Sequence, residues 1–541
     1  MGYEMSDRIP FPFSPDAVPG VTLFLVKSAS VTTPAITPAQ RRFLHLTAAV
    51  NGAAIMIVEI LGAKMLAPYL GTSHFVWTAQ IGIAMASLAF GYYLGGRWAD
   101  ASNHLDRLFT AMLVASGYLC LTVLGVRFVA VKCLDYSLPL GSLLASTFLF
   151  FVPLSLLALT CPFLIRFITS HLKSVGGNVG RLSAVSTVGS LVGTALIGYV
   201  LIPLAPNSVT MYLTAAVVAV VALVHFLVWG NRKVEAAIAT GLVLALGGIA
   251  VAIDQKSRLY QVNQLFRGNS NYGQLQVVET KDGGFRFYVN DYLIQNSYVP
   301  ETRQSASVFT YALHGLARSH AERLDSVLCI GMGVGIVPSL FARDGVRVDV
   351  VEINPAVVPV AQKYFDLDTT LFNLTLGDGR QFLNKRTNQY DAVVLDAFLG
   401  DSSPSHLMTR EAFGAMRELM TSKGVLVINC FGDPKPGRDF LLSSLTKTLR
   451  AVFAEVRLHV AVNGNAFFVA SPSPLKVYRQ VDLSSVHSSV LESVRAVMNR
   501  IHETDPRQGI VLTDDFNPAD FYDAANRERL RRDLAKSMQE L

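Results

Sequence analysis

Residues 43–254 form an almost unbroken apolar stretch, and this stretch limits most strongly what the chain can fold into. It divides into seven segments, each close to the ~20 residues with which an α-helix crosses ~30 Å of hydrocarbon. The segments lie at about 43–66, 75–95, 108–130, 139–168, 183–203, 208–229 and 234–254. The sequence therefore predicts a multi-pass α-helical membrane domain. Residues 1–42 contain six prolines and no periodic pattern, so we expect a disordered tail there.

Composition supports a division into a membrane half and a soluble half. Hydrophobic residues make up 51% of the 541 residues and charged residues 16%, but residues 255–541 have an ordinary charge density. The net charge of +6 is assigned to basic loops that face anionic lipid. No run of lysine and arginine with interleaved aromatic residues indicates a nucleic-acid partner. The five cysteines, at 120, 133, 161, 329 and 430, have no metal-binding spacing, so we expect free thiols, no disulfide and no zinc site.

The basic residues also predict an orientation. Arginines and lysines flank the apolar segments at 41–42, 97–107, 166–181 and 232–233, whereas the connections at 67–74 and 203–207 have none. This pattern places the N-terminus in the cytoplasm, and seven crossings would then place the C-terminal half outside. Either one crossing is miscounted, for which the proline-containing segment 139–168 is the candidate, or the C-terminal half faces out. We expect a miscount and a cytoplasmic C-terminal half.

Two features of the apolar half concern helix packing and function. Small residues recur four apart in GIAMASLAFGYYLGG and STVGSLVGTALIGY, a spacing that lets helix backbones approach closely. Glu59 is a carboxylate within an apolar segment, which is costly unless it faces the bundle interior or a cavity. It has either a structural role, paired with Lys64 or His45, or a functional one.

After residue 270 the pattern changes to short strands. YGQLQVVE and FRFYVND flank a KDGG turn, which predicts a β-hairpin. Strands then alternate with helices through SVLCIG, RVDVVEIN, LTLGDG, YDAVVLDAF and GVLVINC, as in a doubly wound parallel sheet. A later pair around an Asn-Gly turn, EVRLHVAVNGNAFFVAS, predicts an antiparallel hairpin at the end of the sheet.

Three strand ends carry residues suited to a nucleoside ligand. Gly331, Gly333 and Gly335 follow one strand and precede a helix, where glycine lets the backbone approach a ligand. Glu352 ends the next strand, and an acid about 20 residues after such glycines binds ribose hydroxyls. A surface strand end is the alternative for Glu352.

The third and fourth strands also end in acidic residues. Asp378 and Gly379 follow the third strand, where sites for S-adenosylmethionine-type ligands place a polar group beside the adenine. Asp396 ends the apolar strand AVVL, at the ligand edge of an open sheet. A turn is the alternative for Asp378, and a helix cap for Asp396.

Ordered motifs between residues 272 and 413 resemble a known family. They are YG-x-L-x-V, ND-x-x-IQ, IG-x-G-x-G, VEIN, GDGR-x-F, YDAVVLDAF and HLMT-x-EAF. Together with LGGRWAD in the apolar half, they resemble the membrane-fused branch of the spermidine synthase (polyamine aminopropyltransferase) family. The resemblance implies transfer of an aminopropyl group from decarboxylated S-adenosylmethionine, a co-substrate and not a resident cofactor, to putrescine, leaving methylthioadenosine. It further implies that Glu352 binds ribose, that Asp378 and Gly379 bind adenine, and that Asp396 accepts a proton from the attacking amine.

The chain departs from the soluble enzymes mainly where they hold the cationic diamine. Val334 stands where their glycine-rich turn has an aspartate. Their acidic pair corresponds to Ser305 and Ala306, and their Tyr-x-Glu stretch corresponds to residues 309–311. Gly273 stands where they have an early glutamine. The sequence therefore predicts a retained nucleoside site and an altered polyamine site.

Weaker candidates for the acceptor site are Gln274, Gln295, Asp401 and Pro404. Asp514 and Asp515 either meet a cationic substrate or cap a helix. The predicted fold is a multi-pass helical membrane domain (43–254), a β-hairpin module with a linking helix (255–325), a Rossmann-like domain of the class I methyltransferase type (326–475) and a C-terminal helical segment (476–541).

The leading functional hypothesis is a membrane-bound aminopropyltransferase, with a homodimer as a possible assembly. One alternative is methyl transfer, or elimination from S-adenosylmethionine, on a membrane-derived acceptor. The other is a transporter or sensor that only binds nucleoside or polyamine, which Glu59 and the LGGRWAD loop motivate.

Overall fold

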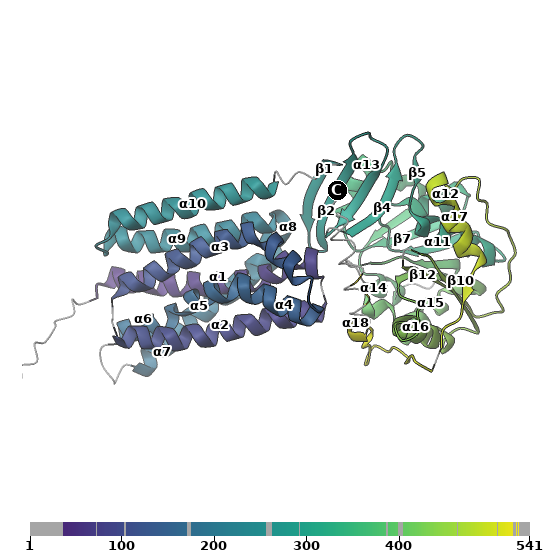
Figure 1. The fold of residues 1–541 in the computed structure, drawn as a ribbon. Coiled ribbons are helices and arrows are strands. Elements are labelled where there is room, and N and C mark those ends of the chain that lie inside the picture. Colours follow the sequence, from purple (N-terminus) through teal and green to yellow (C-terminus); the bar gives the residue numbers. More distant parts are fainter. Residues whose placement is uncertain are drawn as a thin grey trace, which may run out of the picture.

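The computed structural model describes residues 36–529 with short gaps at 72, 102–103, 170–174, 256–261, 292, 386–387, 399–403, 463, 506, 523–525 and 527–528. Most of the tail predicted for residues 1–42 therefore lies outside the described residues. The described chain forms a helical bundle that packs end-on against an α/β domain (Figure 1).

Seven helices of the bundle are long and apolar enough to cross a membrane. They are α1 (Pro38–Leu70), α2 (His74–Ala101), α3 (Leu105–Cys133), the segment Leu138–Ile168, the segment Val175–Leu204, α9 (Asn207–Val228) and α10 (Lys233–Gln255). The fourth contains α4 (Leu138–Ser146), α5 (Val152–Ala158) and α6 (Thr160–Ile168), and the fifth contains α7 (Val175–Leu196) and α8 (Ile202–Leu204). The segment suspected of being miscounted forms one apolar helical rod, Leu138–Ile168, despite Pro153 and Pro162, so the structure gives no support to a miscount there.

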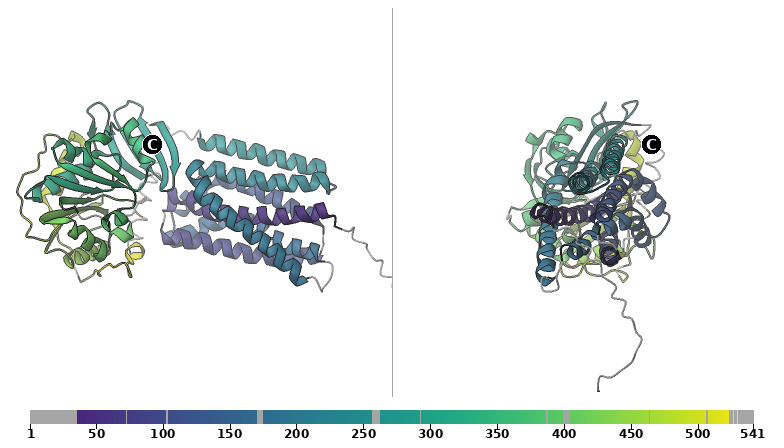
Figure 2. Two further views of the ribbon diagram at one scale, coloured as in Figure 1. Left: turned by 180° about the vertical axis from the view of Figure 1, so that it is seen from behind. Right: turned by 90° about the vertical axis from the view of Figure 1, so that its left-hand side faces the viewer.

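The odd number of helices has a geometric consequence. α1 begins at the end of the bundle far from the α/β domain, and α10 ends beside that domain (Figures 1 and 2). If the bundle crosses a membrane seven times, Pro38 and the α/β domain lie on opposite sides.

Small residues bring the helices together as predicted. A Cβ added to Gly189 of α7 would lie 2.0 Å from the carbonyl oxygen of Ala49 in α1. A Cβ on Gly91 of α2 would lie 2.4 Å from the carbonyl oxygen of Ser155 in α5. Neither predicted ion pair of Glu59 forms within the described residues, and His45 instead bonds through Nδ1 with the carbonyl oxygen of Arg41 at 2.7 Å.

The predicted hairpin is part of a larger antiparallel sheet. Its strands are β1 (Val262–Ser270), β2 (Gly273–Thr280), β3 (Arg286–Asn290), β4 (Leu293–Val299) and β5 (Gln304–Ser305), in that order. β2 and β3 pair around the KDGG turn, with Glu279 opposite Arg286. The sequence analysis thus found the hairpin but missed three of the five strands.

The second sheet has eight strands in the order β13-β11-β12-β10-β9-β6-β7-β8. Its parallel strands are β6 (Ser326–Ile330), β7 (Arg347–Glu352), β8 (Asn373–Leu376), β9 (Tyr390–Leu395) and β10 (Met420–Phe431). The predicted terminal hairpin is β11 (Glu455–Val460) with β12 (Asn465–Ser471), and β13 (Ile501–His502) adds to its outer edge. The chain reverses direction across the sheet between β6 and β9, and such a switch point is where open α/β sheets bind ligands.

Helices cover both faces of this sheet, so successive strand residues are buried alternately on either side. α11 (Val308–His320), α12 (Ile336–Arg343), α13 (Val357–Tyr364) and α17 (Leu491–Asn499) share one core with Val327 and Cys329 of β6. α14 (Gly379–Leu383), α15 (Arg410–Glu418) and α16 (Phe440–Arg450) share the other with Leu328 and Ile330. α18 (Ala519–Tyr522) lies near the bundle (Figure 1). The resulting Rossmann-like architecture holds the carboxyl ends of β6, β7, β8 and β9 along one edge.

Candidate active site

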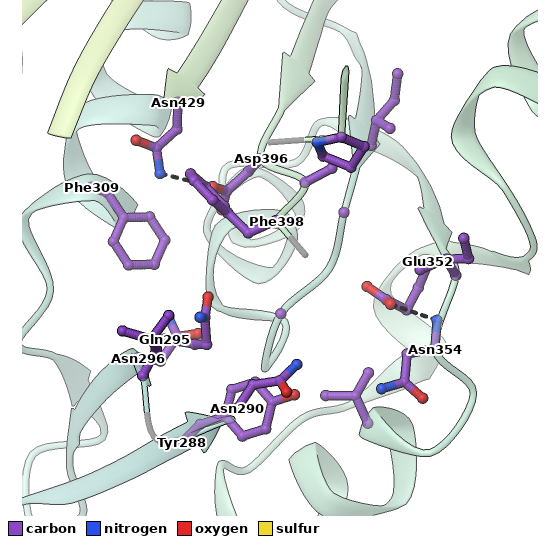
Figure 3. Close-up of a pocket in the computed structure, with 18 of the residues that line it drawn as sticks. Tyr288, Asn290, Gln295, Asn296, Phe309, Glu352, Asn354, Asp396, Phe398 and Asn429 are labelled. Carbon is purple, nitrogen blue, oxygen red and sulfur yellow. Dashed lines mark hydrogen bonds between the residues drawn. The ribbon is translucent and has the colours of Figure 1, made fainter. Parts of the chain in front are cut away.

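A cavity of about 520 Å³ lies at the carboxyl ends of the parallel strands, between the two sheets (Figure 3). It is lined from the large sheet by the end of β10 and by the ends of β6 and β7 with the segments that follow β6, β7, β8 and β9, and from the small sheet by β3 and β4. Of the predicted site residues, it brings together Gly331, Gly333, Glu352, Asp378, Gly379, Asp396, Gln295 and Pro404. A cavity of this size suits a nucleoside-sized ligand.

The glycine turn needs glycine for both conformation and space. Gly331 has a φ of +94°, and a Cβ there would lie 2.1 Å from the carbonyl oxygen of Asp396. Gly333 (φ +55°) also lines the cavity. Gly335 does not line it, because it caps the start of α12 with a φ of +81° and packs under Leu367. The position of Gly335 therefore does not support the prediction that it contacts the ligand. Its role is to start α12.

Glu352 lies inside the cavity wall and holds two backbone segments together. Its carboxylate accepts hydrogen bonds from the backbone N–H of Met332, at 2.9 Å, and of Asn354, at 2.7 Å. Its side chain is 8% exposed, and this burial raises the pKa of its carboxyl group above the ordinary value while the backbone donors oppose the rise. The backbone N–H groups of Gly333 and Ile353 also favour the ionised form of this carboxylate.

Asp378 combines a cap with a place in the cavity. Its Oδ1 accepts the backbone N–H of Gln381 at 2.9 Å, which caps α14. Its Oδ2 lies 3.2 Å from Nε2 of His406, another lining residue. Gly379 is packed against Ile330, since an added Cβ would lie 2.7 Å from its Cγ2. Asp378 can therefore cap α14 and also contact a ligand in the cavity.

Asp396 lies across the cavity from Glu352 (Figure 3). Its Oδ1 accepts a hydrogen bond of 2.9 Å from Nδ2 of Asn429, whose Oδ1 accepts one of 2.9 Å from Asn465. Burial raises the pKa of Asp396 to about 6, the Asn429 hydrogen bond opposes this rise, and the charge of Glu352 adds to it. A carboxylate with this pKa is mostly ionised at pH 7 yet is a stronger base than an exposed aspartate.

The remaining predicted residues are placed differently. Gln274 does not line the cavity, and its buried side chain lies 2.6 Å from that of Gln276. Asp401 lies outside the described residues. Asp514 is also away from the cavity, where it pairs with Arg380 at 2.7 Å and Thr409 at 2.6 Å and so links α14 to the start of α15.

Sequence reasoning missed most of the amides and aromatic residues of the cavity. They are Tyr272, Tyr288, Asn290, Asn296, Phe309, Asn354, Phe398, Asn429, Phe431 and Asn465. Several lie within the quoted motifs: Asn290 in ND-x-x-IQ, Asn354 in VEIN, and Asn429 at the end of GVLVINC. A polar residue at a strand end was thus the available signal, but the predictions from sequence applied this signal only to acids and glycines.

Comparison with known proteins identifies one domain of this chain. Residues 308–463 match the spermine/spermidine synthase domain. The chain carries a spermine/spermidine synthase domain, which belongs to a family of transferases.

The relatives match only part of this chain. A polyamine aminopropyltransferase of Vibrio vulnificus is 36% identical over 24% of the chain and 44% of its own length. An N-terminal histidine N-methyltransferase of Emericella nidulans is 28% identical over 36% and 38%, and a probable polyamine aminopropyl transferase of Bifidobacterium longum is 25% identical over 44% and 49%. A probable spermidine synthase structure from Corynebacterium glutamicum superposes with a TM-score of 0.36 at 17% identity, over 42% of this chain and 86% of that one. The chain thus spans about half the length, or less, of these three curated relatives.

Proposed function

We propose that the spermine/spermidine synthase domain transfers an alkyl group from an S-adenosylmethionine-type sulfonium donor to an amine nitrogen. The first candidate is aminopropyl transfer from decarboxylated S-adenosylmethionine to putrescine or a related amine, with methylthioadenosine as the second product. The observation that supports it most is one cavity with Glu352 and Asp396 on opposite sides, and with a glycine turn in which Gly331 packs against Asp396 and Met332 bonds to Glu352.

In this proposal the donor occupies the side of the cavity next to β7 and β8. Glu352 accepts hydrogen bonds from the ribose hydroxyls, and Asp378 lies beside the adenine. Gly331 and Gly333 let the backbone approach the donor closely, as in other sites at the carboxyl ends of parallel strands.

Asp396 is the proposed proton acceptor. A free alkylamine has a pKa near ~10.4 and is protonated at pH 7, so its nitrogen has no lone pair until a base removes the proton. The ionised carboxylate attracts the ammonium and takes its proton as the nitrogen attacks the carbon bound to sulfur. The C–N bond forms, the C–S bond breaks, and its electron pair remains on the sulfur of a neutral thioether.

Methyl transfer is the second candidate, and the acceptor side of the cavity favours it. The described residues that face Asp396 there are amides and aromatic rings, whereas a diamine would need a second carboxylate. One relative is named as an N-methyltransferase, and methylation of an amine requires only one cation-binding carboxylate. The donor would then be S-adenosylmethionine and the product adenosylhomocysteine.

A direct experiment separates these reactions. The purified full-length protein is incubated with each donor and a panel of amines, and nucleoside products are measured by mass spectrometry. Methylthioadenosine with an alkylated amine supports aminopropyl transfer, and adenosylhomocysteine supports methyl transfer. Absence of either product together with polyamine flux into vesicles would replace both proposals with the transporter or sensor alternative.

We also propose that the bundle is embedded in a cell membrane and that the α/β domain faces the cytoplasm, where the donor is made. Seven crossings then place Pro38 outside, against the distribution of basic residues. Reporters fused to each end, one active only in the cytoplasm and one only outside, decide the orientation. Putrescine or another amine, the bilayer and a second copy of the chain are the proposed partners.

A further inference from the structure

Among the described residues, the acceptor side of the cavity contains a single carboxylate among uncharged groups. Phe309, Phe398 and Asn429 gather around Asp396 (Figure 3), and the ring of Phe431 lies 5.1 Å from that of Phe398. Among the described lining residues the other carboxylates are Glu352 and Asp378, both on the proposed donor side. Aromatic faces and one carboxylate bind one ammonium well, whereas a second ammonium buried here would find no further counter-charge among the described residues of this side.

One rim of the cavity is tied to the end of the helical bundle. Asn354, which lines the cavity, donates a hydrogen bond of 3.2 Å to Oγ of Ser270 at the end of β1. The neighbouring Asn269 donates one of 2.7 Å to the carbonyl oxygen of Ala205, between α8 and α9. Tyr272, in the turn after β1, also lines the cavity. This rim therefore lies directly beside the bundle.

The opposite rim has its own connection to the bundle. The lining residues Pro404 and His406 flank Ser405, whose carbonyl oxygen accepts a hydrogen bond of 3.0 Å from Asn517. Four residues later, the ring of Phe521 lies 5.9 Å from that of Phe75 at the start of α2. Since both rims reach the same end of the bundle, the edge of the sheet that holds the cavity faces the bundle and the membrane surface around it (Figures 1 and 2).

Exposed apolar side chains extend along this edge. Leu376 at the end of β8 is 54% exposed, and Ile353 just after β7 is 38% exposed. Val462, in the turn before β12, is 99% exposed, and the pairing of Asn465 with Phe431 places that turn at the same edge. Apolar side chains that continue from a membrane-spanning bundle onto an adjoining surface are typical of contact with lipid.

We propose that the acceptor is the primary amine of a bilayer lipid headgroup, which enters the cavity from the membrane surface. This proposal rests on the proposed alkyl transfer and specifies its substrate class. A lipid of this kind supplies one ammonium for Asp396 and its aromatic neighbours, and its acyl chains stay in the bilayer. The cavity has a volume of about 520 Å³. With the proposed nucleoside donor bound, it has room for a headgroup amine but not for a whole lipid.

The test uses the full-length protein in nanodiscs of two compositions, phosphatidylcholine alone and phosphatidylcholine with phosphatidylethanolamine. With either donor, we expect nucleoside product and an alkylated phosphatidylethanolamine only in the second composition. Putrescine and a short peptide with a free N-terminus are added to the first composition as alternative acceptors. Nucleoside product with either of these, and none with the lipid, overturns the lipid proposal but supports alkyl transfer. No nucleoside product with any acceptor overturns alkyl transfer itself.

Surface variants test the route of entry separately from the chemistry. Leu376→Asp and Val462→Asp lie outside the cavity lining, and each removes an apolar group at the membrane-facing edge. We expect each to raise the KM for the lipid roughly tenfold, because each replaces an apolar contact with the bilayer by a charged group that favours water. Val477→Asp is the matched control: Val477 is 63% exposed, and its neighbour Tyr478 bonds with Ser319 beside the opposite edge of the sheet. Equal effects of all three variants, or no effect of the first two, would contradict entry from the membrane surface.

Discussion

Replacing Glu352 with glutamine should weaken both nucleoside binding and the glycine turn. Both carboxylate oxygens of Glu352 accept backbone hydrogen bonds, from Met332 at 2.9 Å and Asn354 at 2.7 Å. A glutamine side chain has one oxygen and one NH₂ group, so it can accept only one of these two bonds. The other backbone N–H then faces a donor in a buried site, which costs about 1–3 kcal/mol of folding free energy.

The loss of nucleoside affinity adds to this effect. A hydrogen bond between a carboxylate and a ribose hydroxyl contributes about 1.5–3 kcal/mol, so the affinity for methylthioadenosine should fall roughly ten- to a hundredfold. Isothermal calorimetry measures this affinity, and the midpoint of thermal unfolding reports the loss of stability.

A matched control separates the site from the general loss of one negative charge. Asp368→Asn removes an exposed carboxylate that caps a short 3₁₀ helix (Thr369–Leu371) and lies outside the cavity lining. It should leave the methylthioadenosine affinity unchanged. If Glu352→Gln keeps the wild-type affinity, Glu352 does not bind the nucleoside, and if it keeps the wild-type midpoint, the two backbone bonds do not support the turn.

Other predictions concern the proposed base and the turn. Asp396→Asn should lower turnover by ~10²–10⁴ while donor affinity in calorimetry survives, and near-normal turnover would reduce Asp396 to a strand-end cap. Because burial raises the pKa of Asp396 to about 6, the base is protonated below that pH, so kcat/KM should fall about tenfold per pH unit there; a flat profile contradicts the assignment. Asn429→Ala removes a hydrogen bond that favours the ionised carboxylate, so this limb should move to higher pH in the same assay. Gly331→Ala places a Cβ against the carbonyl oxygen of Asp396, so nucleoside binding should be lost, and an alanine variant that binds normally would show that the turn has room to move.

The sequence alone determined the features that depend on local pattern. Seven apolar segments predicted the seven helices, since each segment has the length and hydropathy of a crossing by itself. The glycines after β6 and the acids after β7, β8 and β9 predicted one site, because the carboxyl ends of parallel strands meet at one edge. Asn354 follows β7 and Asn429 lies near the end of β10, so the same reasoning reaches them once amides are counted.

Only the tertiary structure decided how distant segments meet. Gln274 and Gln295 belong to β2 and β4 of one sheet, with β3 between them, yet only Gln295 lines the cavity, while Gln274 is buried against Gln276. The pKa of Asp396 depends on burial and on Asn429, which lies 33 residues away along the chain. The contact of Asn269 with Ala205 turns the cavity toward the bundle, and no local pattern encodes it. Such contacts follow from the packing of whole elements, whose free energy is summed over many residues, whereas the short motifs report only the backbone beside them.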